Sequence, residues 1–155
     1  MNDIALSHGG PSRALGDMIR KGLVALAVAF TNAGAAIVTN RMIQAGTAPK
    51  NIGWGVGTGA AAVTDSALGT ESAPTTGGGR TVGTESRTTI TNTNDNYQVV
   101  GTVTAGSTLA ITEAGLFDAV SGGNMLLRGV FSAINVVSGD SIQFTFGLKL
   151  VPSVT

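Results

Sequence analysis

Residues 141–151, with the sequence SIQFTFGLKLV, decide the fold. Large apolar side chains alternate there with polar residues or glycine, at Ile142, Phe144, Phe146, Leu148 and Leu150. Successive side chains of a β-strand point to opposite faces of a sheet, so the alternation predicts one dry face and one solvated face. A strand over this whole segment would be about 36 Å long. We therefore expect a long, half-buried strand of an antiparallel sheet.

Two hairpins are predicted upstream of this strand. Residues 109–118 and 125–131 read as strands and flank a Ser-Gly-Gly-Asn turn. Residues 81–91 and 97–104 are rich in Thr and Val and flank a polar turn at 92–96. Thr and Val favour the extended backbone, and Gly and Asn favour tight turns. Each pair of segments is therefore expected to form two adjacent antiparallel strands.

The region before the hairpins combines a short strand, a loop and a helix. Residues 52–56 predict the strand, and residues 57–79, which contain many glycines and a proline, predict one long loop. Residues 33–45 predict a helix that Thr31 or Asn32 can cap at its N-terminus and that a glycine ends. With the hairpins and the last strand, six strands are expected.

The first thirty residues are less regular. From Ser12 onward apolar residues recur at spacings of three and four, which favours a helix, although the alternation of large and small residues over 23–29 also suits a strand. Residues 1–12 have no usable periodicity and are expected to form an arm. We predict a mainly β protein, an antiparallel, jelly-roll-like β-sandwich with one or two N-terminal helices. An extended N-terminal arm and lead-in occupy residues 1–21, and the sandwich domain with its front helix occupies 22–155.

The composition limits the functions that this chain can have. It has 155 residues, nine Lys and Arg, nine Asp and Glu, and a formal net charge of zero. Charged residues make up 12%, against about 25% in an average soluble domain. Bulk charge therefore cannot attract nucleic acid, and we expect no nucleic-acid partner. Neutral, ion-poor surfaces repel one another little, so a protein that assembles with its own copies is expected.

Cofactors, metals and membranes are not expected either. The chain has no Cys and one His, which excludes thiolate sites and any site with two imidazoles. The glycine-rich segment 53–59 is not followed by the Gly-Lys-Ser/Thr of a phosphate loop, and we expect its glycines to permit a turn or close packing around Trp54. The apolar run at 22–30 is too short to cross a bilayer, which needs about 20 residues.

Neither calcium binding nor enzymatic catalysis is predicted. Asn92, Asn94 and Asn96 alternate as calcium ligands do, but a calcium loop of the helix-loop-helix type would need Gly and Glu where this chain has Tyr97 and Val103. A polar hairpin turn is the simpler interpretation. A hydrolase would need a nucleophile with a base in reach, whereas His8 lies in the expected arm.

One ion pair can be predicted from the second hairpin. Glu113 and Asp118 are five residues apart on one strand, so they face opposite sides and cannot pair with each other. If the hairpin is tight, Arg128 lies diagonally across from Glu113. We expect these two residues to form a structural ion pair.

Several segments together resemble a domain of tailed-phage virion proteins. Its first part is carried by TNAG at 31–34, IGWGVGTG at 52–59, and Ala67-Leu68 with Glu71. The second part is carried by ITEAGLFD at 111–118, then Gly123, Leu126-Leu127, the Gly139-Asp140 turn and the hydrophobic last strand. The EAGLFD run is similar to a strand of the phage tail-collar fibre domain and of short capsid cement or decoration proteins. The structural motif comprises Trp54, Glu113, Gly115, Leu116, Phe117, Asp118 and, from the hairpin argument, Arg128.

The resemblance implies a structural virion protein. Tail fibres continue past the collar domain into a shaft and tip, so the short chain favours a capsid cement subunit, made in the host cytoplasm and located on the outer capsid surface of the virion. The partners implied are the major capsid protein and further copies of the chain, in a homo-oligomer, here a trimer. The alternative is a tail-collar or tail-fibre adaptor module that attaches to other tail proteins or recognises the host surface.

The resemblance covers residues 31–151 and supplies no role for the residues before them. In residues 1–12, Ile4 and Leu6 are apolar side chains that a free arm could not bury against itself. An extended segment of this length reaches about 40 Å, far enough to contact a neighbour. We therefore expect a shell-contact arm, with the candidate residues Ile4, Leu6, Arg13, Arg20 and Lys21.

Overall fold

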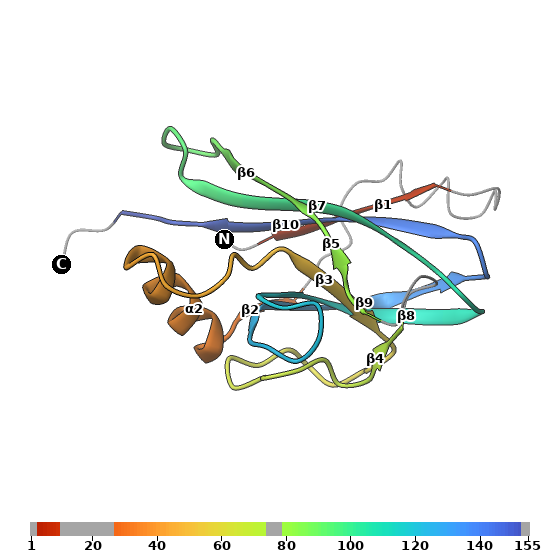
Figure 1. Ribbon diagram of the computed structural model, residues 1–155. Helices are drawn as coiled ribbons and strands as arrows, with labels where there is room; N and C mark the ends of the chain where they lie inside the picture. The colour runs from red at the N-terminus through yellow and green to blue at the C-terminus, as the bar shows by residue number, and fades with distance from the viewer. Residues whose placement is uncertain (1–2, 10–26, 74–78, 153–155) are drawn as a thin grey trace.

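The structure is a computed structural model that describes residues 3–9, 27–73 and 79–152 (Figure 1). Within these residues it has two antiparallel sheets that pack against each other and one helix. This arrangement confirms the predicted mainly β fold and its two-layer architecture. The described residues form ten strands, four more than the six expected.

The smaller sheet has four strands in the order β1-β10-β7-β6. Their bounds are β1 Asp3–Gly9, β10 Ser141–Lys149, β7 Asn96–Thr104 and β6 Thr84–Thr88. The larger sheet has the order β2-β9-β8-β3-β4, and β5 also pairs with β3. Their bounds are β2 Ala27–Phe30, β9 Met125–Val136, β8 Leu109–Phe117, β3 Asn51–Gly55, β4 Glu71–Ser72 and β5 Thr81–Val82.

Strand β10 has the dry and solvated faces that its alternation predicts. Ile142, Phe144, Phe146 and Leu148 are buried, whereas the residues between them are exposed or half-buried. The strand ends at Lys149, so Leu150 lies beyond it and is exposed, which corrects the predicted end of the dry face.

The core lies between the two sheets. Trp54 of β3 packs edge-on against Phe144 of β10, with ring centroids 6.4 Å apart. Phe146 stacks on Phe144 within the smaller sheet, and Leu116 of β8 is buried in the same cluster. The contact of Trp54 with Phe144 joins residues far apart in sequence and in different sheets, so the two layers depend on each other for burial.

Both predicted hairpins are present, although residues 81–91 do not form one strand. Strands β8 and β9 are adjacent, as are β6 and β7. Strand β5 pairs with β3 in the larger sheet, so the chain changes sheets at Gly83 between β5 and β6. A Cβ atom at Gly83 would lie 2.6 Å from Val99 Cγ1, so a larger residue would clash there. The loop expected over 57–79 contains the short strand β4.

The prediction of a free arm is wrong for residues 3–9, because they form β1 at the edge of the smaller sheet. Ile4 is paired with Phe146 of β10 in the antiparallel register, and Leu6 is paired with Phe144. Both apolar residues alternate with Asp3, Ala5 and Ser7, a period of two that indicates a strand.

The helix favoured from Ser12 to Phe30 is not present at its C-terminal end, where residues 27–30 are strand β2, paired with β9. The alternation of large and small residues over 23–29, which suits a strand, therefore predicts the end of this segment better than the helical spacing does. Residues 10–26 lie outside the described residues, and with them Arg13, Arg20 and Lys21 of the predicted arm.

Helix α2, Asn32–Met42, is the predicted front helix, and it ends three residues before the expected Ala45. Thr31 is its N-cap: its hydroxyl accepts a hydrogen bond from Gly34 N at 2.9 Å and donates one to Met125 O. The cap therefore also fixes the helix to the start of β9.

Candidate functional site

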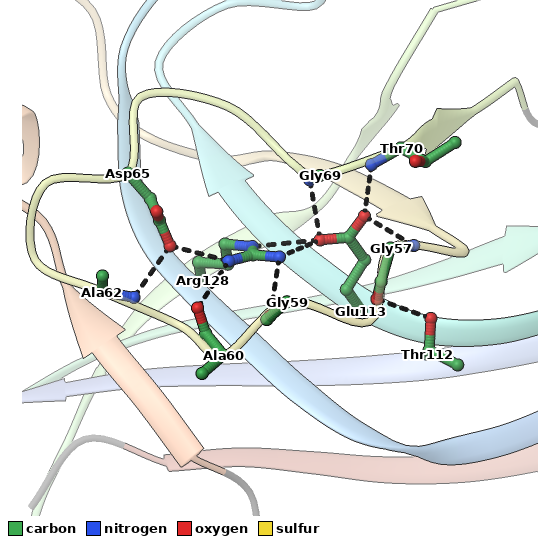
Figure 2. Close-up of polar contacts among 10 residues, drawn as sticks. All are labelled: Gly57, Gly59, Ala60, Ala62, Asp65, Gly69, Thr70, Thr112, Glu113 and Arg128. Carbon is green, nitrogen blue, oxygen red and sulfur yellow. Dashed lines mark hydrogen bonds and ion pairs between the residues drawn. The ribbon is translucent and has the colours of Figure 1, made fainter.

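The most concentrated set of charged groups lies on the outer face of the larger sheet (Figure 2). Glu113 comes from β8, Arg128 from β9 and Asp65 from the loop between β3 and β4. Arg128 Nη2 lies 2.7 Å from Glu113 Oε2, and Arg128 Nη1 lies 2.7 Å from Asp65 Oδ2. Arg128 is paired with Gly115 in the register, so it is diagonal to Glu113 and the predicted ion pair is confirmed.

Glu113 is saturated with hydrogen-bond donors. Its side chain is 0% exposed. Oε1 accepts from Gly57 N at 3.0 Å and Thr70 N at 2.8 Å. Oε2 accepts from Gly69 N at 2.9 Å and from Arg128 Nε and Nη2 at 3.0 and 2.7 Å. A buried carboxylate is stable only when its charge is compensated in this way.

These contacts determine the protonation state of Glu113. Burial by itself raises the pKa of a carboxyl group, because it removes water from the charged form. The backbone donors of Thr70 and Gly69 and the charge of Arg128 outweigh burial, so the pKa of Glu113 lies below its ordinary value. The group is therefore a fixed anion and not a carboxyl prepared to exchange a proton.

Arg128 connects the sheet to the loop on the other side of the cluster. Its Nη2 donates to Gly59 O at 3.1 Å, and its Nη1 donates to Ala60 O at 3.2 Å as well as to Asp65. Asp65 Oδ2 also accepts from Ala62 N at 2.8 Å. Burial opposes both charges, but the Ala62 amide and Arg128 lower the pKa of Asp65, and the two carboxylates of Asp65 and Glu113 raise that of Arg128. The three side chains thus hold residues 57–70 against the sheet.

The glycines of residues 53–59 make room for this cluster. A Cβ atom on Gly57 would collide with Glu113 Oε1, and one on Gly55 with Thr70 O. A Cβ atom on Gly59, by contrast, would meet no atom within 4 Å in the structure. The glycines permit close packing, but the prediction that they pack around Trp54 is wrong. They make room on the opposite face of β3, whereas the indole of Trp54 is in the core.

The rest of the structural motif lies beside the cluster and in the core. The guanidinium of Arg80 lies over the Phe117 ring, 3.3 Å from its centroid, and it also binds Glu71 with Nε and Nη2 at 2.8 and 3.0 Å. A Cβ on Gly115 would lie 2.9 Å from the Phe117 ring, so Gly115 permits this stack. Leu116 points into the core.

Asp118 of the motif closes the turn between β8 and β9. Its Oδ1 accepts from Asn124 N at 2.7 Å, and its Oδ2 accepts from Asn124 Nδ2 at 3.2 Å. Its side-chain partner is thus Asn124, whereas Glu113 pairs with Arg128. Its hydrogen bonds stabilise a turn.

The turn between β6 and β7 is the polar hairpin turn that was predicted. Its organising residue is Asp95, which lies between the alternating asparagines. Its carboxylate accepts from Ile90 N, Thr91 N and Asn92 N at 2.7 to 2.9 Å. These backbone donors lower the pKa of Asp95 to about 2.

The part of the chain that the structure describes contains no group of three or more His, Cys, Asp or Glu side chains that could hold a metal ion. None of its helices is long and apolar enough to cross a membrane. Comparisons with known protein families, with curated proteins and with solved structures found no match to this chain.

The sequence predicted only part of this site. The structure brings Glu113 and Arg128 together as expected, with Gly115 and Phe117 nearby. Asp65 and the amides of residues 57–70 were missed, because a long loop has no periodicity that shows where it folds back. The dense glycines opposite a buried carboxylate are the one signal that could have indicated this contact.

Proposed function

We propose that this chain is a structural virion protein, a capsid cement subunit that binds the outer surface of a shell and connects neighbouring shell proteins. The resemblance of residues 31–151 to cement and tail-collar proteins motivates the proposal. The jelly-roll-like arrangement and the trimer that the resemblance implies are part of it. The major capsid protein and further copies of the chain are the proposed partners.

The observation that carries the proposal is that side chains of the structural motif bind partners within the chain. Glu113, Phe117 and Asp118 all have their partners within the chain, at Arg128, Arg80 and Asn124. A reactive centre would need a nucleophile or a base that is accessible and poised to react. The motif instead stiffens one sheet and its loop, which is what a subunit that transmits force between neighbours requires.

The stabilising effect would follow from mass action. A protein that binds the assembled shell, and not its dissociated subunits, shifts the equilibrium toward the shell. The effect grows with the number of occupied sites, so a small rigid domain suffices if many copies bind. No covalent chemistry is required.

The direct test is to mix the purified protein with undecorated capsids of its phage and to image the particles by electron cryomicroscopy. We expect ordered density on the outer shell surface at a copy number comparable to that of the shell protein, and a higher temperature of capsid rupture. An unrelated β-sandwich of similar size is the control. Density confined to the tail, in a few copies, would contradict the cement function and favour the tail adaptor.

A further inference from the structure

Strand β3 would be an open edge of the larger sheet if β4 and β5 did not cover it. One side of β3 pairs with β8, and among the described residues its other side pairs only with β4 and β5, strands of two residues each. β4 is opposite residues 54–55 and β5 is opposite residues 51–52, so Gly53 lies between the two. We call these two short strands the edge cover.

An ion pair joins the two strands of the edge cover. Glu71 begins β4, and Arg80 directly precedes β5. Arg80 Nε and Nη2 donate to Glu71 Oε1 and Oε2 at 2.8 and 3.0 Å. A Cβ atom on Gly53 would lie 2.7 Å from Glu71 Oε1 and 3.3 Å from Arg80 Nε. The bidentate pair therefore lies directly against the residue of β3 that neither short strand covers.

The two partners of this pair differ in how firmly they are held. The side chain of Arg80 is 7% exposed, and its Nη1 also donates to Ala119 O at 3.0 Å and Gly122 O at 2.6 Å in the turn between β8 and β9. The side chain of Glu71 is 36% exposed. Arg80 is thus the fixed partner, and Glu71 is the accessible one that attaches β4 to it.

The edge cover is also anchored on either side of the ion pair. Thr70 N, before β4, donates to Glu113 Oε1 at 2.8 Å, and Gly83 N, after β5, donates to Lys50 O at 2.7 Å. Loss of the ion pair leaves these two hydrogen bonds in place. The edge cover can therefore open locally while the rest of the sandwich keeps its packing.

An uncovered β3 would have nothing of its own to repel another strand. All five of its residues are buried, and none of them is charged. Unpaired N–H and C=O groups along such a strand form a template for pairing with another chain. β6, at the edge of the smaller sheet, differs because it is exposed and carries the charged residues Glu85 and Arg87. The chain has no net charge, so general repulsion does not protect β3 either.

We propose that the Glu71–Arg80 pair keeps the edge of β3 closed to a second copy of the chain, which pairs with this edge through its own β3 when the ion pair is broken. Two antiparallel copies of one edge strand match each other about a two-fold axis, so the same segment serves on both sides. The ion pair then has a role in keeping free copies apart. The inference does not depend on the proposed function, because it concerns subunits that have not yet bound a partner.

The test compares Glu71→Arg with the matched control Glu85→Arg, both in the full chain. Glu85 is a similar carboxylate, 40% exposed and paired with Lys50, but it lies on β6 of the smaller sheet. Both variants exchange a negative for a positive charge, so they change the net charge equally. Protection of the Ser72 amide against hydrogen exchange shows whether β4 remains paired with β3, because Ser72 is opposite Trp54 in the ladder. Sedimentation velocity over a concentration series measures association.

We expect Glu71→Arg to lower the protection of Ser72 on the order of tenfold or more, because two charge-assisted hydrogen bonds are lost. The same variant should form larger oligomers than the wild type as its concentration rises. Glu85→Arg should do neither. Glu71→Gln and Glu85→Gln give the same comparison with a smaller change, should Glu71→Arg fail to fold.

Three results would overturn the inference. Unchanged protection of Ser72 in the Glu71 variants would show that the ion pair does not hold the edge cover. Lower protection without more association than in the Glu85 variants would show that the open edge does not bind a second copy. Equal association of the two arginine variants would assign the effect to their charge. Binding to capsids is measured separately, so none of these results decides the proposed function.

Discussion

Strands β8 and β10 are both nine residues long and belong to different sheets, and they differ in how their outer faces are covered. The outer face of β10 has exposed and half-buried residues. The outer face of β8 is covered by residues 57–70, which Glu113 and Arg128 hold in place. This difference in cover explains the burial patterns of the two strands. Buried residues alternate with more exposed ones along β10, whereas most residues of β8 are buried. A sheet covered on both faces loses the period of two.

The largest expected loss of stability concerns the outer face of β8, which residues 57–70 cover. Glu113→Ala leaves the amides of Gly57, Gly69 and Thr70 without their acceptor and removes one of the two carboxylates that compensate the buried charge of Arg128. Removing one partner of a buried pair costs about 3 to 5 kcal/mol, and the unpaired amides place this change at the upper end, near 5. Urea unfolding of the variant measures the change. A loss below about 1 kcal/mol would mean that the loop does not depend on this carboxylate.

The next effect concerns the dry face of β10. Phe146→Ala should cost about 4 kcal/mol, through lost burial and the cavity that remains. Lys149→Ala, on the same strand, is the control. Lys149 donates to Thr91 Oγ1 in an exposed contact, and its loss should cost less than about 0.5 kcal/mol. Equal shifts of the melting temperature in the two variants would contradict the assignment of the faces.

A pair of glycine variants tests how tightly the loop covers β8. Gly57→Ala places a methyl group against Glu113 and should destabilise by about 1 to 3 kcal/mol, as overpacking does. Gly59→Ala meets open space and should change stability by less than about 1 kcal/mol, in either direction. Thermal unfolding of the two proteins measures the difference. A harmless Gly57→Ala would show that the loop can move away from the sheet.

The smallest expected effect is the pH dependence of stability that Asp95 contributes in the turn between β6 and β7. The pKa of Asp95 is lowered from 3.8 to about 2 in the folded protein. The charged carboxylate therefore stabilises the fold fully above about pH 4, and this contribution is lost as the pH falls toward 2. Asp95→Asn should be less stable at neutral pH and should have a shallower decline between these values. Urea unfolding at a series of pH values gives both slopes, and identical slopes would contradict the role of Asp95.

The sequence predicts those features of the fold and of the site whose signal lies within a short segment of the chain. Alternation located β10, and turn chemistry located both hairpins. The ion pair of Glu113 and Arg128 followed from the diagonal geometry of a ladder. The crossing at Gly83 and the contact with Asp65 depend on which segments lie nearby in space, and no local pattern contains that information. Strand β1 was missed because its alternation is short, with only Ile4 and Leu6 as large apolar residues.

The pairing of β1 with β10 has a consequence for the order of folding. Ile4 lies opposite Phe146, so this ladder joins residues separated by nearly the whole described chain. Closing so long a loop is entropically costly, and contacts of this kind slow folding. During synthesis β1 leaves the ribosome before the other described strands and cannot pair until β10 has followed. Until then the smaller sheet lacks the strand that lies between β1 and β7, so co-translational folding can begin with the larger sheet but cannot finish before residue 149 is made.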